Sequence, residues 1–196
     1  MRMYRRYGKR IFDIIFSLCV IIIISPFLLL ISVAIKLDSK GPVLFIQERM
    51  GKGKKAFLLY KFRTMTHKKR DPAGVIYLDN PEITNVGRIL RRFKLDELPQ
   101  FFNVLIGNMS VVGPRPCLYS TYIKHKNTNT NFRFNVKPGV TSPAGVSGSI
   151  FLSWDQKWSL DKNYAFNLSF KKDVLIIVKT IQVVIFGEKK FISNGN

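Results

Sequence analysis

The sequence has few of the residues on which metal, redox and nucleophilic enzymes commonly depend. Its 196 residues include two cysteines, Cys19 and Cys117, and two histidines, His67 and His125. Two cysteines are too few for a disulfide framework or a cysteine-rich metal site. Two histidines leave little room for a zinc site or a histidine-dependent triad. We therefore expect a protein of a reducing compartment whose chemistry rests on other side chains.

Acidic residues are also scarce, with 12 against 32 lysines and arginines, so the formal net charge is +20. This excess predicts an anionic partner, which could be nucleic acid, anionic lipid or a phosphorylated small molecule. Hydrophobic residues make up 46% of the chain, too many for a disordered protein. The length suits one domain with a sizeable core, so we predict a single domain over residues 1–196.

The longest uncharged stretch runs from Ile14 to Ile35. A straight helix of that length is about 33 Å long, enough to cross the hydrocarbon core of a bilayer. Basic residues both precede and follow it, whereas a spanning helix normally has its basic flank on one side only. Ser25 and Pro26 lie at its midpoint, where the proline interrupts helical hydrogen bonding. We therefore predict a re-entrant helical hairpin over 11–36, which enters one leaflet and returns, with its break at Ser25–Pro26.

Three other interpretations of this segment stay open. An ordinary single-pass anchor that tolerates the proline is the main alternative. A cleaved signal peptide is disfavoured because the apolar run is longer than usual and basic residues follow it directly. A buried helix in the core of a soluble protein is the least favoured.

The remainder of the chain predicts a mainly helical α+β fold with a small β-hairpin. Apolar runs at 43–46 and 56–63 flank a glycine-rich turn, which is typical of such a hairpin. Residues 66–82 have the composition of a long surface loop. Residues 111–116 contain two prolines and a glycine, so we expect a non-helical connector there.

Three further helices are expected. Thr84 is suited to cap a helix over 86–93. Asp96 or its neighbour is expected to cap the next helix, which has Pro99 in its first turn and ends at Gly107–Asn108. From Phe170 onward, apolar residues keep helical spacing among lysines, which favours an amphipathic helix at a membrane interface. A core helix with exposed lysines is the alternative.

The adjacent pair Asp96–Glu97 is the strongest candidate for chemistry, because it directly follows a cluster of basic residues. Neighbouring helical side chains project about 100° apart, so the two carboxylates are expected to have different roles. One would act as nucleophile or metal ligand and the other as base or orienting group. A helix cap with surface ion pairs is the alternative interpretation.

Basic residues elsewhere could bind a phosphate. Prolines on both sides of Arg115 fix its backbone, which favours bidentate phosphate binding, although the segment could simply be a turn. Lys61 and Arg63 alternate with bulky residues and could bind an anion, or they could form the polar face of a strand.

Several longer motifs, taken in order, resemble the bacterial sugar transferase family, the monotopic phosphoglycosyl transferases that begin glycan assembly on polyprenol phosphate. The resemblance covers residues 7 to 186 and has the minimal form of that family. Its motifs are Lys9-Arg10-Ile11-Phe12-Asp13, Ser25-Pro26, Lys40-Gly41-Pro42-Val43, Tyr60-Lys61-Phe62-Arg63-Thr64-Met65, Gly87-Arg88, Leu95-Asp96-Glu97-Leu98-Pro99-Gln100, Asn103-Val104-Leu105 and Val112-Gly113-Pro114-Arg115-Pro116.

The resemblance implies Mg²⁺-dependent transfer of a phosphosugar from a UDP-sugar to undecaprenyl phosphate, with release of UMP. It implies that Asp96 is the nucleophile and forms a covalent phosphosugar intermediate, and that Asp96 and Glu97 bind the metal. Arg115 and Arg88 would contact substrate phosphate, as would Lys61 and Arg63. The protein would lie in the bacterial inner membrane with its active site facing the cytoplasm. Membrane lipids and a second copy of the chain are further expected partners.

The stretch from 142 to 149 departs from the family pattern, because its amides and arginine are absent. This departure leaves the transferred sugar open and keeps a catalytically silent membrane scaffold of a glycan-assembly complex as the alternative function. A nucleic-acid-binding module would also explain the net charge. It is disfavoured, because no recognition helix or aromatic RNA-binding motif is visible, and we expect no nucleic-acid partner.

Overall fold

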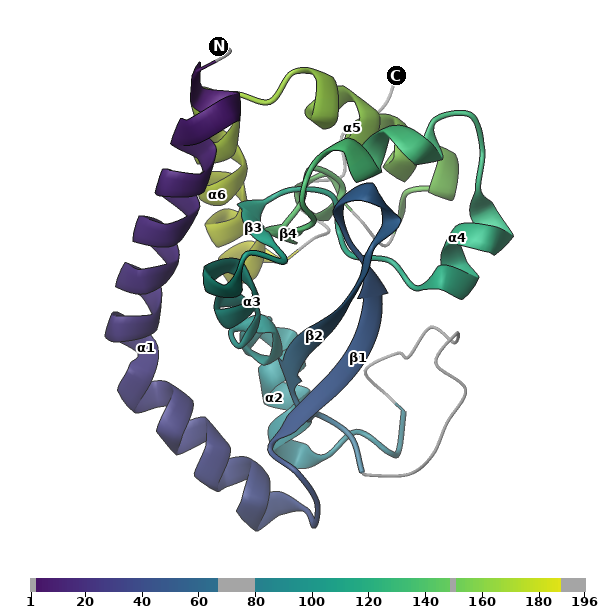
Figure 1. Cartoon of the computed structure of the whole chain (residues 1–196). Helices are drawn as coiled ribbons and strands as arrows, with labels where there is room; N and C mark the ends of the chain where they lie inside the picture. Colours follow the sequence, from purple (N-terminus) through teal and green to yellow (C-terminus); the bar gives the residue numbers. More distant parts are fainter. Residues whose placement is uncertain (1–2, 67–79, 149–150, 188–196) are drawn as a thin grey trace.

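The computed structural model describes residues 3–66, 80–148 and 151–187. These residues form a mainly helical α+β fold, as the sequence predicts, with two short sheets where the sequence predicts one β-hairpin (Figure 1). Most of the surface loop predicted over 66–82 lies outside the described residues. The elements are η1 Tyr4–Gly8, α1 Lys9–Asp38, β1 Leu44–Met50, η2 Lys52–Lys54, β2 Ala56–Phe62, α2 Asn85–Arg92, η3 Leu95–Glu97, α3 Gln100–Ile106, β3 Ser110–Val112, α4 Tyr119–His125, η4 Thr130–Asn135, β4 Gly139–Thr141, η5 Ala144–Val146, α5 Trp154–Phe166 and α6 Phe170–Phe186.

The long apolar segment forms a single bent helix, α1, which continues through Pro26 (Figure 1). Pro26 has no N–H to donate to the carbonyl of Ile22, four residues earlier. The hydroxyl of Ser25 donates to that carbonyl at 2.9 Å, so the exposed acceptor keeps a partner. Where the sequence predicts a break between two arms, the structure therefore has a bend within one helix. The re-entrant path of this segment stays a prediction.

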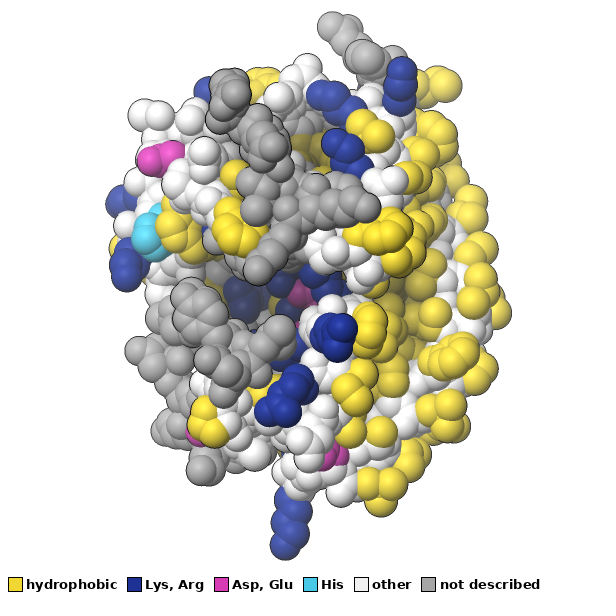
Figure 2. Space-filling model, turned by 180° about the vertical axis from the view of Figure 1, so that it is seen from behind, with side chains coloured by type: hydrophobic (Ala, Val, Ile, Leu, Met, Phe, Trp, Pro, Cys, Tyr) yellow, Lys and Arg dark blue, Asp and Glu magenta, His cyan; other side chains and the backbone are white. Residues whose placement is uncertain are grey.

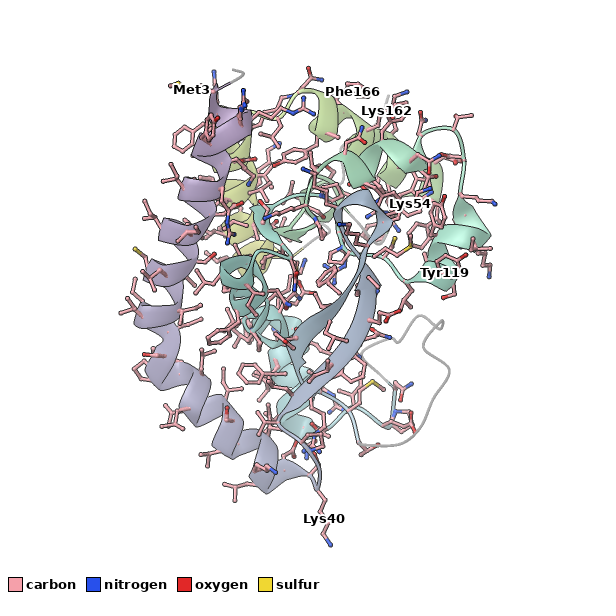
Figure 3. All side chains as sticks on the ribbon, viewed as in Figure 1. Met3, Lys40, Lys54, Tyr119, Lys162 and Phe166 are labelled. Carbon is pink, nitrogen blue, oxygen red and sulfur yellow. The ribbon has the colours of Figure 1, made fainter. Side chains whose placement is uncertain are left out.

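Most of the outer surface of α1 is apolar and uncovered. Among the described residues, those from Tyr4 to Asp38 form the one helix that is long and apolar enough to cross a membrane, and little of its most apolar part is buried. Many of its apolar side chains point away from the rest of the molecule, and hydrophobic atoms form a band along this edge (Figures 2 and 3). A helix in a soluble core would be covered, so this exposure disfavours that interpretation.

Polar contacts attach both ends of α1 to the rest of the fold. Near its start, Asp13 accepts bonds from the Ser110 hydroxyl and the Val111 N–H of β3. At its C-terminal end, the buried guanidinium of Arg63 donates to the carbonyls of Ile35, Ser39 and Lys40. Between these ends, inward-facing aromatic residues such as Phe12 and Phe16 pack on the main core. The apolar helix is therefore attached to the rest of the fold at both ends and along its inner face.

The predicted β-hairpin is confirmed, and its first strand is longer than the 43–46 run. β1 and β2 pair antiparallel from Leu44–Phe62 to Met50–Ala56. Opposed residues share a face, so Arg49 and Lys61 lie on the same face of the ribbon. The turn between the strands carries Lys52, Lys54 and Lys55.

The helices that follow the hairpin largely match the sequence prediction. The Thr84 hydroxyl accepts a bond from the Gly87 N–H and caps α2, as predicted. Asp96 does not cap α3, because it lies in the separate turn η3 and Pro99 is the N-cap of α3. α3 ends at Gly107, whose φ of 103° suits glycine.

The connector over 111–116 is non-helical, as predicted, and begins in β3, which pairs in parallel with β4. The backbones approach closely here, because a Cβ added to Gly113 would lie 2.3 Å from the Lys137 carbonyl oxygen. The helix predicted from Phe170 is α6. Several of its apolar side chains are exposed, while Ile176 and Val183 are buried. Its place at a membrane interface stays a prediction.

Candidate active site

The carboxylate pair Asp96–Glu97 lies in η3, a short turn between α2 and α3. Lys94, in a left-handed conformation with φ 56°, redirects the chain from α2 into this turn. The flanking Leu95 and Leu98 pack in the same apolar cluster as Leu28 of α1. The turn that carries the two carboxylates therefore packs against the exposed apolar helix.

Glu97 is bound by two cations from separate elements. The Lys61 ammonium on β2 lies 2.7 Å from Glu97 Oε1, and the Arg115 guanidinium donates to both carboxylate oxygens. Burial opposes the negative charge, but Arg115 and Lys61 outweigh it and hold the pKa of Glu97 well below its usual range. Glu97 is therefore ionised and fixes the positions of Lys61 and Arg115.

Asp96 has a different environment. Its nearest cation in the described part of the chain is Lys61, at 3.9 Å, and no described residue donates a hydrogen bond to its carboxylate. Burial raises the pKa of Asp96, and the charge of Glu97 raises it further, while Lys61, Arg115 and Arg91 act in the opposite direction. The oxygens of Asp96 therefore keep lone pairs available, and a higher basicity favours nucleophilic attack.

The pair also fits the donor set that Mg²⁺ uses with phosphorylated substrates. Mg²⁺ commonly takes one or two protein carboxylates and completes its octahedral shell with water and phosphate oxygens. The described residues contain no group of three or more histidine, cysteine and acidic side chains suited to a metal. Asp96 accepts no hydrogen bond from a described residue, whereas both oxygens of Glu97 accept bonds from Arg115, so a metal held by this pair together with a substrate stays a prediction.

Two of the predicted phosphate ligands, Arg63 and Arg88, form no ion pair with either carboxylate in the described structure. The Arg63 side chain is buried at the end of α1, where three backbone carbonyls occupy its donors, so it does not support the predicted phosphate contact. Arg88 is exposed on α2, and its side chain forms no ion pair with a described residue. The structure brings together Asp96, Glu97, Lys61 and Arg115 from the predicted set.

The sequence interpretation missed three arginines around this site. Arg49 lies beside Arg115 and Lys61, and burial together with the charge of Arg115 lowers the pKa of Arg49 to about 10. The alternation of the hairpin strands could have identified it, because Arg49 shares the Lys61 face. Arg91, and not Arg88, is the α2 arginine whose charge acts on Asp96.

Arg133 contacts the backbone of Arg115 and helps to hold it in position. Its guanidinium donates to the Arg115 carbonyl, pairs with Asp161 at 3.4 Å and stacks over Trp158 at 4.3 Å. Both members of this ion pair are buried. No local motif in the sequence connects Arg133 to Arg115, so only the fold shows this contact.

The cations of the site border a small cavity of about 20 Å³, lined by Arg49, Leu59, Lys61, Gln100, Arg115 and Pro116. The molecule is hollowed on this side, where basic side chains surround acidic ones (Figure 2). A volume of this size holds about one water molecule. A larger anionic substrate would therefore bind over the mouth of this cavity.

Replacing Arg115 with alanine should raise the pKa of Glu97 toward its usual range, because one of its two cations is lost while Lys61 remains. A pH titration of the ¹³C-labelled carboxyl group by NMR measures this change. Arg88→Ala is the matched control, since Arg88 is exposed and makes no ion pair with a described residue. An unchanged pKa in Arg115→Ala would show that Arg115 does not interact with Glu97 in solution.

Most of this chain matches a known protein family and several known proteins. A family model described as bacterial sugar transferase matches residues 4–187. The "Uncharacterized sugar transferase EpsL" of Bacillus subtilis is 39% identical over 92% of this chain and 88% of its own length. The "UDP-N-acetylgalactosamine-undecaprenyl-phosphate N-acetylgalactosaminephosphotransferase" of Aeromonas hydrophila is 39% identical over 91% of this chain, and this match spans 44% of that protein. The "UDP-glucose:undecaprenyl-phosphate glucose-1-phosphate transferase" of Escherichia coli is 36% identical over 92% of this chain and 40% of its own length.

Proposed function

Because this chain belongs to the bacterial sugar transferase family, we propose that it transfers a sugar phosphate from a UDP-sugar to undecaprenyl phosphate and releases UMP. The names of the Aeromonas and Escherichia relatives describe this type of transfer. Most support comes from one observation: Asp96, which accepts no hydrogen bond from a described residue, lies beside Glu97, which is held by two cations. We further propose that this transfer is the first membrane step of a polysaccharide or glycoprotein glycan pathway.

In the first step, a carboxylate oxygen of Asp96 attacks the phosphorus that carries the sugar. An Asp96–phosphorus bond forms, the bond to the bridging oxygen of the diphosphate breaks, and UMP leaves with that oxygen. The cations Lys61, Arg115 and Arg49 lie where they can neutralise charge on the phosphate oxygens. Their fixed positions are useful because positioned cations stabilise the transition state without reorganising during the reaction.

In the second step, an oxygen of undecaprenyl phosphate attacks the same phosphorus. The lipid diphosphate sugar forms and the Asp96 carboxylate is released. Splitting the transfer in this way lets the two anionic substrates use the same cationic site in turn. The packing of Leu95 and Leu98 with α1 residues supports this scheme, because it keeps the nucleophile next to the surface from which a lipid phosphate would approach.

Mg²⁺ is proposed as the cofactor, with Asp96 and Glu97 as its protein ligands. When bound, the ion would lower the negative charge of the donor diphosphate. Removing divalent cations with EDTA is expected to lower turnover at least about tenfold, and added Mg²⁺ should restore it. Full activity after chelation, in protein shown to be metal-free, would remove the metal from the proposal.

We propose that the protein resides in the bacterial inner membrane with its active site facing the cytoplasm. The long exposed α1 supports a membrane location, and UDP-sugars are expected on the cytoplasmic side. Cysteine residues placed at both termini and treated with a membrane-impermeant reagent would test the path of α1. Labelling of the two ends from opposite sides of the membrane would exclude the re-entrant path.

The decisive experiment offers the purified chain undecaprenyl phosphate, Mg²⁺ and a set of UDP-sugars that includes UDP-glucose, UDP-galactose and UDP-N-acetylgalactosamine. We expect at least one donor to release UMP and yield a lipid-linked sugar phosphate. If a folded protein releases no UMP with any donor, the alternative function is favoured, a catalytically silent membrane scaffold of a glycan-assembly complex. The departure from the family pattern over 142–149 gives that alternative its support.

A further inference from the structure

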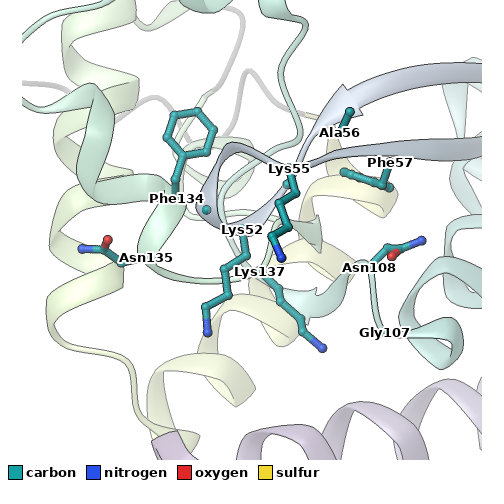
Figure 4. Close-up of a pocket in the computed structure, with 11 residues that line it drawn as sticks. Lys52, Lys55, Ala56, Phe57, Gly107, Asn108, Phe134, Asn135 and Lys137 are labelled. Atoms are coloured by element: carbon teal, nitrogen blue, oxygen red, sulfur yellow. The ribbon is translucent and has the colours of Figure 1, made fainter.

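A second cationic cavity, of about 640 Å³, lies apart from the carboxylate pair. It is enclosed by the hairpin turn, the C-terminal end of α3, the end of η4 and Lys137 (Figure 4). None of its lining residues also lines the small cavity beside Lys61 and Arg115. The described fold therefore has two separate places where cations border an open volume.

Three lysines from different segments contribute charge to this cavity: Lys52 and Lys55 from the hairpin turn, and Lys137 from the segment before β4. Their side chains extend to the same side of the cavity (Figure 4). No aspartate or glutamate lines it, and the three ammonium groups make no ion pair or hydrogen bond with a described residue. Three like charges that share a recess repel one another, so a bound anion would be stabilised there.

A fourth cation reaches the same place from α1. A Cβ added to Gly107 would lie 3.5 Å from Arg10 Nη2 and 3.7 Å from Lys137 Nζ, so both cations face the end of α3. Arg10 also donates to the Val104 and Leu105 carbonyls. These bonds to the end of α3 explain the position of Arg10. Lys52 and Lys55 lie in the hairpin turn, and no contact of their ammonium groups with a described residue explains why they line the same cavity.

The lining also includes groups that can complete an anion site. Asn108 and Asn135 supply amide donors, and Phe57 and Phe134 form an apolar wall. Arg10 lies in the part of α1 whose neighbouring apolar residue, Ile11, is exposed. The cavity is thus connected, through Arg10, to the helix that carries the uncovered apolar surface.

From this arrangement we infer that the cavity of Lys52, Lys55 and Lys137 binds a phosphate-bearing ligand separate from the transferred sugar phosphate. Lysine acts as a point charge toward phosphate and suits a group that is held without strict geometry. The ligand could be the headgroup of an anionic phospholipid or a soluble phosphate compound. The inference does not depend on sugar transfer, because binding is measured without a UDP-sugar.

The test compares two triple variants that each remove three positive charges. The cavity variant is Lys52→Gln/Lys55→Gln/Lys137→Gln. The control variant is Lys124→Gln/Lys126→Gln/Lys171→Gln, whose lysines are exposed and whose ammonium groups make no hydrogen bond or ion pair with a described residue. Native mass spectrometry in detergent micelles measures retention of phosphatidylglycerol, with phosphatidylcholine as the zwitterionic comparison, and calorimetric titration measures affinity for inorganic phosphate.

We expect the cavity variant to bind phosphatidylglycerol roughly 10 to 100-fold more weakly than the control variant and the unaltered protein. A loss confined to inorganic phosphate would instead identify a soluble phosphate compound as the ligand. Equal binding of both probes by the two triple variants would overturn the inference. Thermal unfolding establishes that the variants are folded, and the single variant Lys55→Gln, with a smaller expected loss, provides the comparison if the cavity variant is not.

Discussion

Replacing Asp96 with asparagine is expected to lower sugar phosphate transfer at least about 10³-fold. The amide keeps the size of the side chain but cannot attack phosphorus as a carboxylate does. The fold should be retained, because no described residue donates a hydrogen bond to the Asp96 carboxylate. UMP release with the competent UDP-sugar measures the loss.

Intact-protein mass spectrometry provides a second measurement on the same variant. Without undecaprenyl phosphate, the unaltered protein should gain the mass of one sugar phosphate, and Asp96→Asn should gain none. Glu48→Gln makes the same chemical change at an exposed strand residue outside the site and should keep both activity and adduct. If Asp96→Asn retains a tenth or more of the turnover, Asp96 is not the nucleophile.

Replacing Asp13 with alanine is expected to lower the free energy of unfolding by about 3–5 kcal/mol. Asp13 is 1% exposed and accepts bonds from Lys9 at 3.0 Å, the Ser110 hydroxyl at 2.9 Å and the Val111 N–H at 3.0 Å. Lys9 also pairs with the buried Asp173 at 3.1 Å. Removing Asp13 would leave the buried Lys9 ammonium with one carboxylate and the Val111 N–H without its acceptor, while the Ser110 hydroxyl would keep the Val112 carbonyl at 2.9 Å.

The effect should extend to the position of α1, because this network is its polar attachment to β3 and α6. Tyr4 and Tyr164 each donate to Asp173 at 2.6 Å, so one buried cluster connects η1, α1, α5 and α6. Denaturant unfolding in detergent micelles measures the change. Glu48→Ala, which removes an exposed carboxylate, should stay within about 0.5 kcal/mol of the unaltered protein. A similarly small change in Asp13→Ala would show that the network does not stabilise the fold.

Local patterns in the sequence predicted elements whose residues interact with near neighbours. The hairpin, the Thr84 cap, the end of a helix at Gly107 and the helix from Phe170 are all confirmed. Each depends on side chains a few residues apart or on the backbone preference of glycine and proline. The proposed capping by Asp96 was wrong because Lys94 and Pro99 divide that stretch into two turns.

Only the fold shows which of the basic residues act on the carboxylate pair. Arg63 and Lys61 are two residues apart and both follow the pattern of a cationic strand, yet Arg63 binds the carbonyls at the end of α1 while Lys61 contacts Glu97. Arg91 is partly buried and its charge acts to lower the pKa of Asp96, whereas Arg88 is exposed on the same helix. With 32 basic residues available, charge alone could not distinguish these roles.

The sequence by itself determined the mainly helical class, the long apolar helix, the carboxylate pair and the family, because composition, periodicity and motif order are properties of the chain. Only the tertiary structure decided how the two carboxylates differ, that Ser25 supplies the hydrogen bond lost at Pro26 in a continuous helix, and that Lys52, Lys55 and Lys137 share a cavity. The physical reason is distance: a carboxylate's pKa and a cavity's charge depend on groups brought within a few ångströms from remote parts of the chain.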